Sequence, residues 1–157
     1  MPIIKIETKI NAPIEIVFDL ARSIDLHKKS QSKHKEKAIA GKTSGLIELN
    51  ESVTWQANHF GVPLKLTSRI TKMNRPFHFR DSMVSGAFKT FDHDHFFEKI
   101  SEMETLMKDT FDFETPFGFI GNLVNFLFLE RYMKKLLIDR AQVIKLNAES
   151  EEKFNYI

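Results

Sequence analysis

Residues 91–97 combine histidine, aspartate and phenylalanine in one short segment, Phe-Asp-His-Asp-His-Phe-Phe, whose alternation is typical of a β-strand. Alternation gives an apolar face carrying the histidines (Phe91, His93, His95, Phe97) and an acidic face (Asp92, Asp94, Glu98), and we expect the acidic face to be solvated. A buried imidazole needs a hydrogen-bonding partner. Imidazoles gathered on an apolar inner face indicate a cavity that holds a ligand.

The strand before this segment can supply such a partner. If residues 85–90 form a hairpin loop and the apolar faces match, Asp81 lies opposite His93 and Phe79 lies opposite His95. Directly opposed residues on antiparallel strands have Cβ atoms about 4.5–5.5 Å apart. A carboxylate would therefore lie within reach of an inward histidine.

The strand after it can supply a second partner. A hairpin through Ser101-Glu102 predicts His93 opposite Asp109 and His95 opposite Met107. His93 would then lie between two carboxylates, although a one-residue slip in register would undo the arrangement. The complete inward set of the three strands is Phe79, Asp81, Met83, Phe91, His93, His95, Phe97, Met107, Asp109, Phe111 and Phe113.

Three interpretations of this cluster stay open. It is a buried polar network that anchors the sheet, or the polar end of an apolar pocket that binds a hydroxyl, carbonyl or carboxylate group. In the third, the carboxylates orient His93 as a general base and Asp109 or His95 relays the proton. No serine or cysteine nucleophile signature accompanies it, so we assign no catalytic residue and keep His93, Asp81 and Asp109 as candidates.

Metal binding is a further interpretation of the same cluster. His93 and His95, two residues apart on a strand with a carboxylate nearby, can supply three ligands. The spacing is weakly specific. We therefore expect no metal and no cofactor.

The composition limits the class of protein. The 157 residues are 42% hydrophobic and 28% charged, which predicts one globular domain over residues 1–150 and a tail over residues 151–157. The sequence holds no cysteine, which excludes disulfides and fits a reducing cytoplasm. A net charge of +2 gives no argument for nucleic acid. Charges within the first 20 residues exclude a secretion signal there, and the longest apolar region, residues 117–129, is too short to span a bilayer, so we expect a cytoplasmic protein.

The remaining elements follow from periodicity. Residues 4–10 alternate as a first strand, and a helix capped by Asn11 or Ala12 should run to about Arg22, with Pro13 in its first turn. Residues 46–113 alternate almost throughout, with turns near residues 60–63, 74–76, 85–87 and 101–102, which predicts an antiparallel meander. After residues 115–118, a helix of about thirty residues carries an apolar stripe: Ile120, Leu123, Val124, Leu127, Met133, Leu136, Leu137, Ala141 and Ile144.

This order of elements, together with several short stretches, resembles the START/Bet v 1-like (SRPBCC) superfamily over essentially the whole chain. The stretches are residues 10–21, Val53-Thr54-Trp55 with His59-Phe60-Gly61, Arg75-Pro76 with Phe79-Arg80-Asp81, residues 86–89 with 93–98, and Pro116-Phe117-Gly118. They are similar to the bacterial ligand-binding branch. The resemblance implies an α+β helix-grip fold, a curved antiparallel sheet of six or seven strands around a long C-terminal helix, with a hydrophobic pocket for lipids, sterols, quinones or polyketides. The superfamily also contains cyclases, so the fold does not fix an activity.

We therefore expect a carrier or sensor of a hydrophobic small molecule. The expected apolar walls are Phe79, Met83, Phe91, Phe97, Met107, Phe111, Leu123 and Leu127, and the expected polar groups are Asp81, His93, His95 and Asp109. Trp55 and His59 share the inward phase of an earlier strand, whereas Arg69 points outward. The alternative function is that of a cyclase- or hydratase-like enzyme.

A lysine-rich stretch, residues 27–42, is expected to be a solvated loop over the pocket mouth. The alternative is attraction to anionic lipid, because each lysine near such a surface contributes about 1 kcal/mol. Burial within the grip of the sheet is the default expectation for five surplus apolar residues, Phe117, Phe119, Phe126, Phe128 and Leu129. The alternatives are that they line the entrance, form a dimer contact or touch a membrane transiently. The oligomeric state stays open between monomer and homodimer, and a protein-interaction module remains a third class.

Overall fold

The computed structural model describes residues 3–115 and 123–157, which form a seven-stranded antiparallel sheet and three α-helices. The strands are β1 (Ile3–Ile10), β2 (Lys37–Gly41), β3 (Ser52–His59), β4 (Val62–Asn74), β5 (His78–Ser85), β6 (Thr90–Ser101) and β7 (Glu104–Glu114). The helices are α1 (Ile14–Ala21), α2 (Ile24–Ser30) and α3 (Leu123–Ala148), with short 3-10 turns η1 (Ser32–His34) and η3 (Glu151–Asn155).

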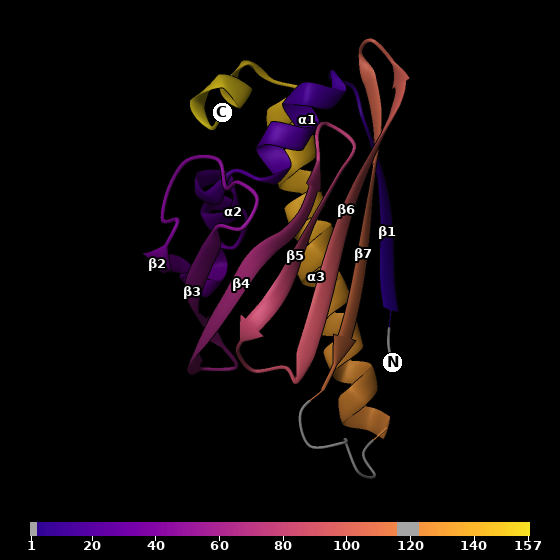
Figure 1. Cartoon of the computed structure of the whole chain (residues 1–157). Coiled ribbons are helices and arrows are strands. Elements are labelled where there is room, and N and C mark those ends of the chain that lie inside the picture. Colours follow the sequence, from indigo (N-terminus) through magenta and orange to yellow (C-terminus); the bar gives the residue numbers. More distant parts are fainter. Residues whose placement is uncertain (1–2, 116–122) are drawn as a thin grey trace.

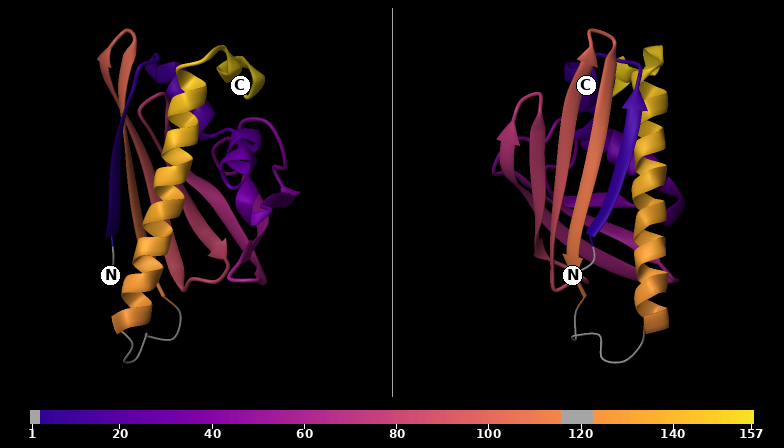
Figure 2. Two further views of the ribbon diagram at one scale, coloured as in Figure 1. Left: turned by 180° about the vertical axis from the view of Figure 1, so that it is seen from behind. Right: turned by 90° about the vertical axis from the view of Figure 1, so that its right-hand side faces the viewer.

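The strand order is β1-β7-β6-β5-β4-β3-β2, so the chain crosses from β1 at one edge to β2 at the other before the meander returns (Figure 1). The long helix α3 lies along one face of the curved sheet, as both views of Figure 2 show. This is the predicted helix-grip arrangement, α+β with a long C-terminal helix. None of the described helices is both long and apolar enough to cross a membrane.

Local sequence explains two of the junctions. The β3–β4 hairpin turns on Phe60-Gly61, with φ of +55° and +75°, a pair of positive angles that a two-residue hairpin loop favours. Helix α1 begins after Pro13, whose backbone carbonyl accepts from the amides of Ile16 and Val17. The prediction that Asn11 or Ala12 caps this helix was wrong, because Pro13 occupies the cap position in an extended conformation.

The lysine-rich stretch is not a loop, contrary to our expectation. It forms helix α2, turn η1 and the edge strand β2. Ser23 caps α2 by accepting a hydrogen bond from the Leu26 amide at 3.2 Å, and Ile24 and Leu26, just before the first lysines of this stretch, are buried in the apolar core. Two apolar residues in a seven-residue helix are too few to produce a periodic signal, so the sequence pattern concealed it.

The register of β5 with β6 is as predicted: Asp81 is paired with His93 and Phe79 with His95. The predicted register of β6 with β7 was wrong by two residues, because His93 is paired with Phe111 and His95 with Asp109. An irregularity between Lys99 and Ser101 adds a residue near the turn. A two-residue shift keeps every side chain on its predicted face, since strands alternate with period two.

Two groups of buried apolar residues hold the layers together. The larger group joins α1, α2 and the end of α3 to the sheet, and the smaller one joins β1, β6 and β7 to the middle of α3 through Leu137. Tyr156, in the expected tail, is partly buried against the larger group. The end of the chain is therefore docked against the domain.

Candidate functional site

A cavity of about 420 Å³ lies between the sheet, α2 and α3. Its apolar lining comes from all three layers: Ala21, Ile24, Ile47, Val53, Trp55, Ala57, Phe60, Leu64, Leu66, Ile70, Phe79, Ala87, Phe88, Phe91, Phe111, Leu129, Met133, Leu136 and Leu137. Its polar lining is Arg22, Ser23, His27, Gln31, Glu36, His59, Lys65, Ser68, Asp81, His93, His95, Thr115, Tyr132 and Arg140. Cavities of this size and composition are typical of small-molecule sites.

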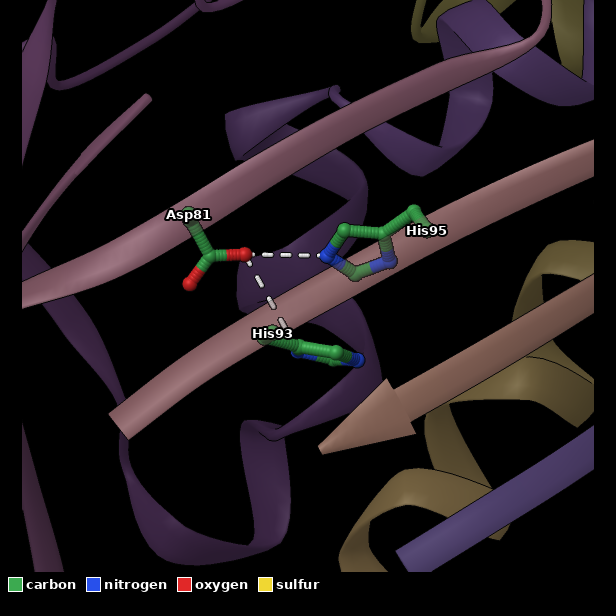
Figure 3. Close-up of side chains that lie close together, drawn as sticks. All are labelled: Asp81, His93 and His95. Atoms are coloured by element: carbon green, nitrogen blue, oxygen red, sulfur yellow. Dashed lines mark hydrogen bonds and ion pairs between the residues drawn. The ribbon is translucent and has the colours of Figure 1, made fainter. Parts of the chain in front are cut away.

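The predicted cluster forms on the wall of this cavity, with His95 rather than His93 at its centre. Nε2 of His95 lies 2.9 Å from Oδ2 of Asp81, and Nδ1 of His95 lies 2.8 Å from Oδ1 of Asp109. His93 contacts the same two carboxylates less closely, through Nε2 to Asp109 at 3.1 Å and through Nδ1 to Asp81 at 3.9 Å. Figure 3 shows the Asp81 carboxylate on β5 facing both rings on β6.

Asp109 lies behind the histidines, outside the described lining of the cavity, and its side chain is only 2% exposed. Nη1 of Arg140, on α3, lies 3.6 Å from its Oδ1, while Nη2 donates to the Ala21 carbonyl at 2.7 Å. Arg140 was missed by the sequence analysis. It falls three residues after Leu137 and four before Ile144, on the apolar stripe of the helix, and that position was the available signal.

The surroundings shift the pKa values of His95 and His93 in opposite directions. Burial by itself would lower the pKa of His95, but its hydrogen bonds to Asp109 and Asp81 outweigh burial and raise the pKa above its ordinary value. The pKa of His93 is lowered by burial and by the charge of the neighbouring His95. Burial alone would raise the pKa of Asp81 and of Asp109, yet hydrogen bonds from the histidines keep both pKa values below the ordinary range.

The outer face of β6 is less solvated than predicted. Asp94 is buried, because Arg80 on β5 reaches both of its carboxylate oxygens at 2.8 and 2.7 Å and Nε2 of His78 lies 2.7 Å from Oδ1. The expectation that the whole acidic face is wet was therefore wrong at this residue. Cross-strand basic side chains cover the carboxylate.

A second polar group lies on the cavity wall near α2. Nε2 of His27 is 2.8 Å from a carboxylate oxygen of Glu36, and the His27 ring lies against Trp55 with centroids 4.4 Å apart. Both His27 and Glu36 belong to the stretch expected to be a solvated loop. Trp55 lies in the main core as well as on the wall, so it anchors the sheet and borders the cavity at once.

The cavity mouth lies beside the β3–β4 hairpin. Phe60 both lines the cavity and is 62% exposed, which places it at an opening. Nδ1 of His59 lies 2.6 Å from the Tyr132 hydroxyl, and the rings of Phe60 and Tyr132 are 4.6 Å apart. These contacts connect the hairpin to α3 across the opening.

The predicted site residues fall into three groups. Trp55, His59, Phe79, Asp81, Phe91, His93, His95 and Phe111 line the cavity. Five predicted residues lie outside the described lining: Met83, Phe97, Met107, Asp109 and Leu127. Phe97 and Met107 belong to the core instead, and Leu127 is 42% exposed. The side chain of Leu123 and the predictions for residues 117–122 and 126 lie outside the described part of the chain. Arg69 is exposed, as its phase indicated.

No protein-family model matches the sequence, and no curated protein matches it. Solved structures do resemble this one. A START superfamily protein from Mycobacterium smegmatis has a TM-score of 0.71 at 10% identity, covering 94% of this chain and 97% of that one. Ginseng major latex-like protein 151 from Panax ginseng has a TM-score of 0.66 at 13% identity, covering 95% and 98%. The ZhuI aromatase/cyclase from Streptomyces sp. R1128 has a TM-score of 0.64 at 15% identity, covering 98% and 94%.

At these identities the likeness shows the fold. The chain has the helix-grip fold of the START/Bet v 1-like (SRPBCC) superfamily, as the sequence resemblance predicted.

Proposed function

We propose that this helix-grip domain binds a hydrophobic small molecule in the cavity between sheet and α3, as a carrier or sensor. The observation that supports the proposal most directly is the cavity itself, about 420 Å³ in volume and walled by residues from every layer of the fold. Small-molecule sites are mostly apolar with a few placed polar groups. The lining has this composition.

The polar groups indicate the kind of ligand. Asp81, His93, His95 and Arg140 all line the cavity, with side chains that offer both hydrogen-bond donors and acceptors. An apolar ligand with one hydroxyl or carbonyl group would bury its body against the aromatic walls and bind these groups with its polar end. Quinones, sterols, polyketides and lipids have this character.

Native mass spectrometry of freshly purified protein, followed by solvent extraction, is the first test. We expect a mass above that of the 18.3 kDa chain and an extractable apolar compound. As a second measurement, the neutral fluorescent probe N-phenyl-1-naphthylamine should bind stoichiometrically. A clean apo mass together with no probe binding would refute the proposal.

A cyclase- or hydratase-like enzyme is the second candidate, favoured by the position of the acid–base groups on the cavity wall. His93 holds a lowered pKa, is hydrogen-bonded to Asp109 behind it and lies beside Asp81. A neutral imidazole at such a wall can remove a proton from an activated carbon of a bound polyketide, with Asp109 orienting the ring.

One variant, His93→Gln, distinguishes an enzyme from a carrier. In an enzyme, His93→Gln should leave probe binding within about twofold and abolish turnover of aromatic polyketide precursors, because the substitution removes the base and keeps the volume. In a carrier, the same variant should change affinity or ligand preference, and the wild-type protein should give no turnover.

A further inference from the structure

We propose that Asp81, His93 and His95 form a binding site for one divalent first-row transition metal ion, with Asp109 orienting both histidines from behind. The proposal goes beyond the binding of a hydrophobic molecule, and metal binding does not require such a molecule to be bound. The sequence spacing of His93 and His95 was only weakly specific for a metal, and we expected none; the argument for a metal comes from the three-dimensional arrangement.

The first argument is the convergence of three donor atoms. One donor atom from each of Asp81, His93 and His95 lies within 4.8 Å of the donor atoms of the other two, and Figure 3 shows the Asp81 carboxylate facing both rings. The separations from Oδ2 of Asp81 are 2.9 Å to His95 and 3.9 Å to His93. Three ligands about 2.0–2.1 Å from a tetrahedral Zn²⁺ lie about 3.4 Å apart. The observed distances bracket that value, so small rotations of the side chains would complete the geometry.

The second argument concerns the other nitrogen of each ring. His93 donates through Nε2, and His95 through Nδ1, to the same oxygen of Asp109, at 3.1 and 2.8 Å. With these hydrogen bonds in place, Nδ1 of His93 and Nε2 of His95 face Asp81, and each would be a metal ligand once it carries no proton. A carboxylate that accepts from the far nitrogen of a metal-binding histidine is the usual support of such a ligand. Here the single carboxylate of Asp109 supports both histidines.

The third argument is charge. The carboxylates of Asp81 and Asp109 carry two negative charges beside the single guanidinium of Arg140, whose Nη1 lies 3.6 Å from Oδ1 of Asp109. Buried charges in proteins are paired with opposite charges or coordinate metals. A divalent cation held by Asp81, His93 and His95 would add positive charge beside Asp81.

The fourth argument is access. Asp81, His93 and His95 all line the cavity, so a metal held by three protein ligands would keep its remaining positions toward the cavity, the arrangement that leaves room for a ligand oxygen. Two nitrogens and one carboxylate oxygen suit zinc or iron(II). Either ion would serve as a Lewis-acidic anchor for a ligand carbonyl or hydroxyl group.

The test uses tag-free, full-length protein stripped with EDTA and titrated with ZnCl₂ by calorimetry and with CoCl₂ by visible absorption. We expect one ion per chain and the intense absorption of four- or five-coordinate cobalt. Asp81→Asn and His95→Gln should each weaken Zn²⁺ binding at least 100-fold, and Asp109→Asn about 10- to 100-fold. The matched control is His78→Gln, which disrupts a histidine–aspartate pair on the same two strands but on the outer face, and should leave affinity unchanged.

A second measurement on the wild-type chain guards against variants that fail to fold. Long-range ¹H–¹⁵N spectra of the imidazoles should show Zn²⁺ on Nδ1 of His93 and on Nε2 of His95, two different ring nitrogens. Failure to bind equimolar Zn²⁺ and Co²⁺ at micromolar concentration, or ions seated on other residues, would overturn the proposal. Uptake of N-phenyl-1-naphthylamine, measured in parallel, reports the cavity independently and distinguishes failure of the metal site from failure of the proposed function.

Discussion

Oδ1 of Asp109 lies 2.8 Å from Nδ1 of His95, and both side chains are at most 2% exposed. The pair joins the neighbouring strands β6 and β7. Since His95 also contacts Asp81 on β5, one imidazole ties three consecutive strands together. The same ring lies flat against Phe79, with centroids 4.2 Å apart.

We expect Asp109→Asn to lower the free energy of unfolding by about 3 kcal/mol, because removing one partner leaves the other buried charge uncompensated. Urea unfolding followed by circular dichroism measures the change. The control is Asp92→Asn on the outer face of β6, where the carboxylate is 47% exposed and the loss should stay within about 1 kcal/mol. Equal effects of the two substitutions would contradict the expected role of burial.

Asp94 gives a prediction about pH. Burial alone would raise the pKa of Asp94, but hydrogen bonds from Arg80 and His78 outweigh burial and keep it below its ordinary value of 3.8. A carboxyl with a lowered folded-state pKa stabilises the fold above its unfolded pKa, and this stabilisation is lost as the pH falls through the folded pKa. Asp94→Asn should therefore be less stable than wild type at pH 6, and the gap should narrow toward pH 3.

The measurement is urea unfolding of both proteins from pH 6 to pH 3. Arg80→Gln removes the main partner of Asp94 and should therefore reduce the loss of stability between pH 6 and pH 3. Combining Asp94→Asn with Arg80→Gln should change the free energy of unfolding little further. A gap between wild type and Asp94→Asn that stays constant with pH would show that the pair is not linked to proton binding.

Much of this site follows from alternation alone. Asp81, His93 and His95 were placed on one face of adjacent strands by counting residues, and a two-residue error in the β6–β7 register left every face correct. What that error changed was the partner, so His95 rather than His93 lies between the two carboxylates. Hairpin register depends on the turn, and the irregularity at residues 99–101 has no marker in the sequence.

Contacts between distant segments could not be predicted in this way. Arg140 meets Asp109 only because α3 crosses the sheet at that point, and His27 meets Trp55 only because α2 folds over β3. Periodicity assigns a face to each residue within one element. It does not assign the angle or height at which two elements cross, and these contacts depend on both.

The contact between His59 and Tyr132 predicts a kinetic effect at the mouth of the cavity. Tyr132→Phe removes a hydrogen bond that connects the β3–β4 hairpin to α3, worth about 1 kcal/mol. Release of N-phenyl-1-naphthylamine, followed by stopped-flow fluorescence, should become about fivefold faster with a smaller change in affinity. The matched control is the other tyrosine of the chain: Tyr156→Phe lies outside the described lining and should leave the release rate unchanged. Equal rates in wild type and Tyr132→Phe would exclude a gating role for this contact.

Filling the cavity tests whether its volume is available to a ligand. Ala57 lies on the cavity wall and is 5% exposed, so Ala57→Leu adds three carbon atoms to open space, and we expect little change in the free energy of unfolding. N-phenyl-1-naphthylamine binding should weaken at least tenfold, because the added side chain occupies the site. Ala148→Leu is the matched control in the packed core, where the same addition should cost about 1–3 kcal/mol and leave probe affinity unchanged. Destabilisation by Ala57→Leu equal to that by Ala148→Leu would mean that the wall is as tightly packed as the core, and the cavity could then not serve as a binding site.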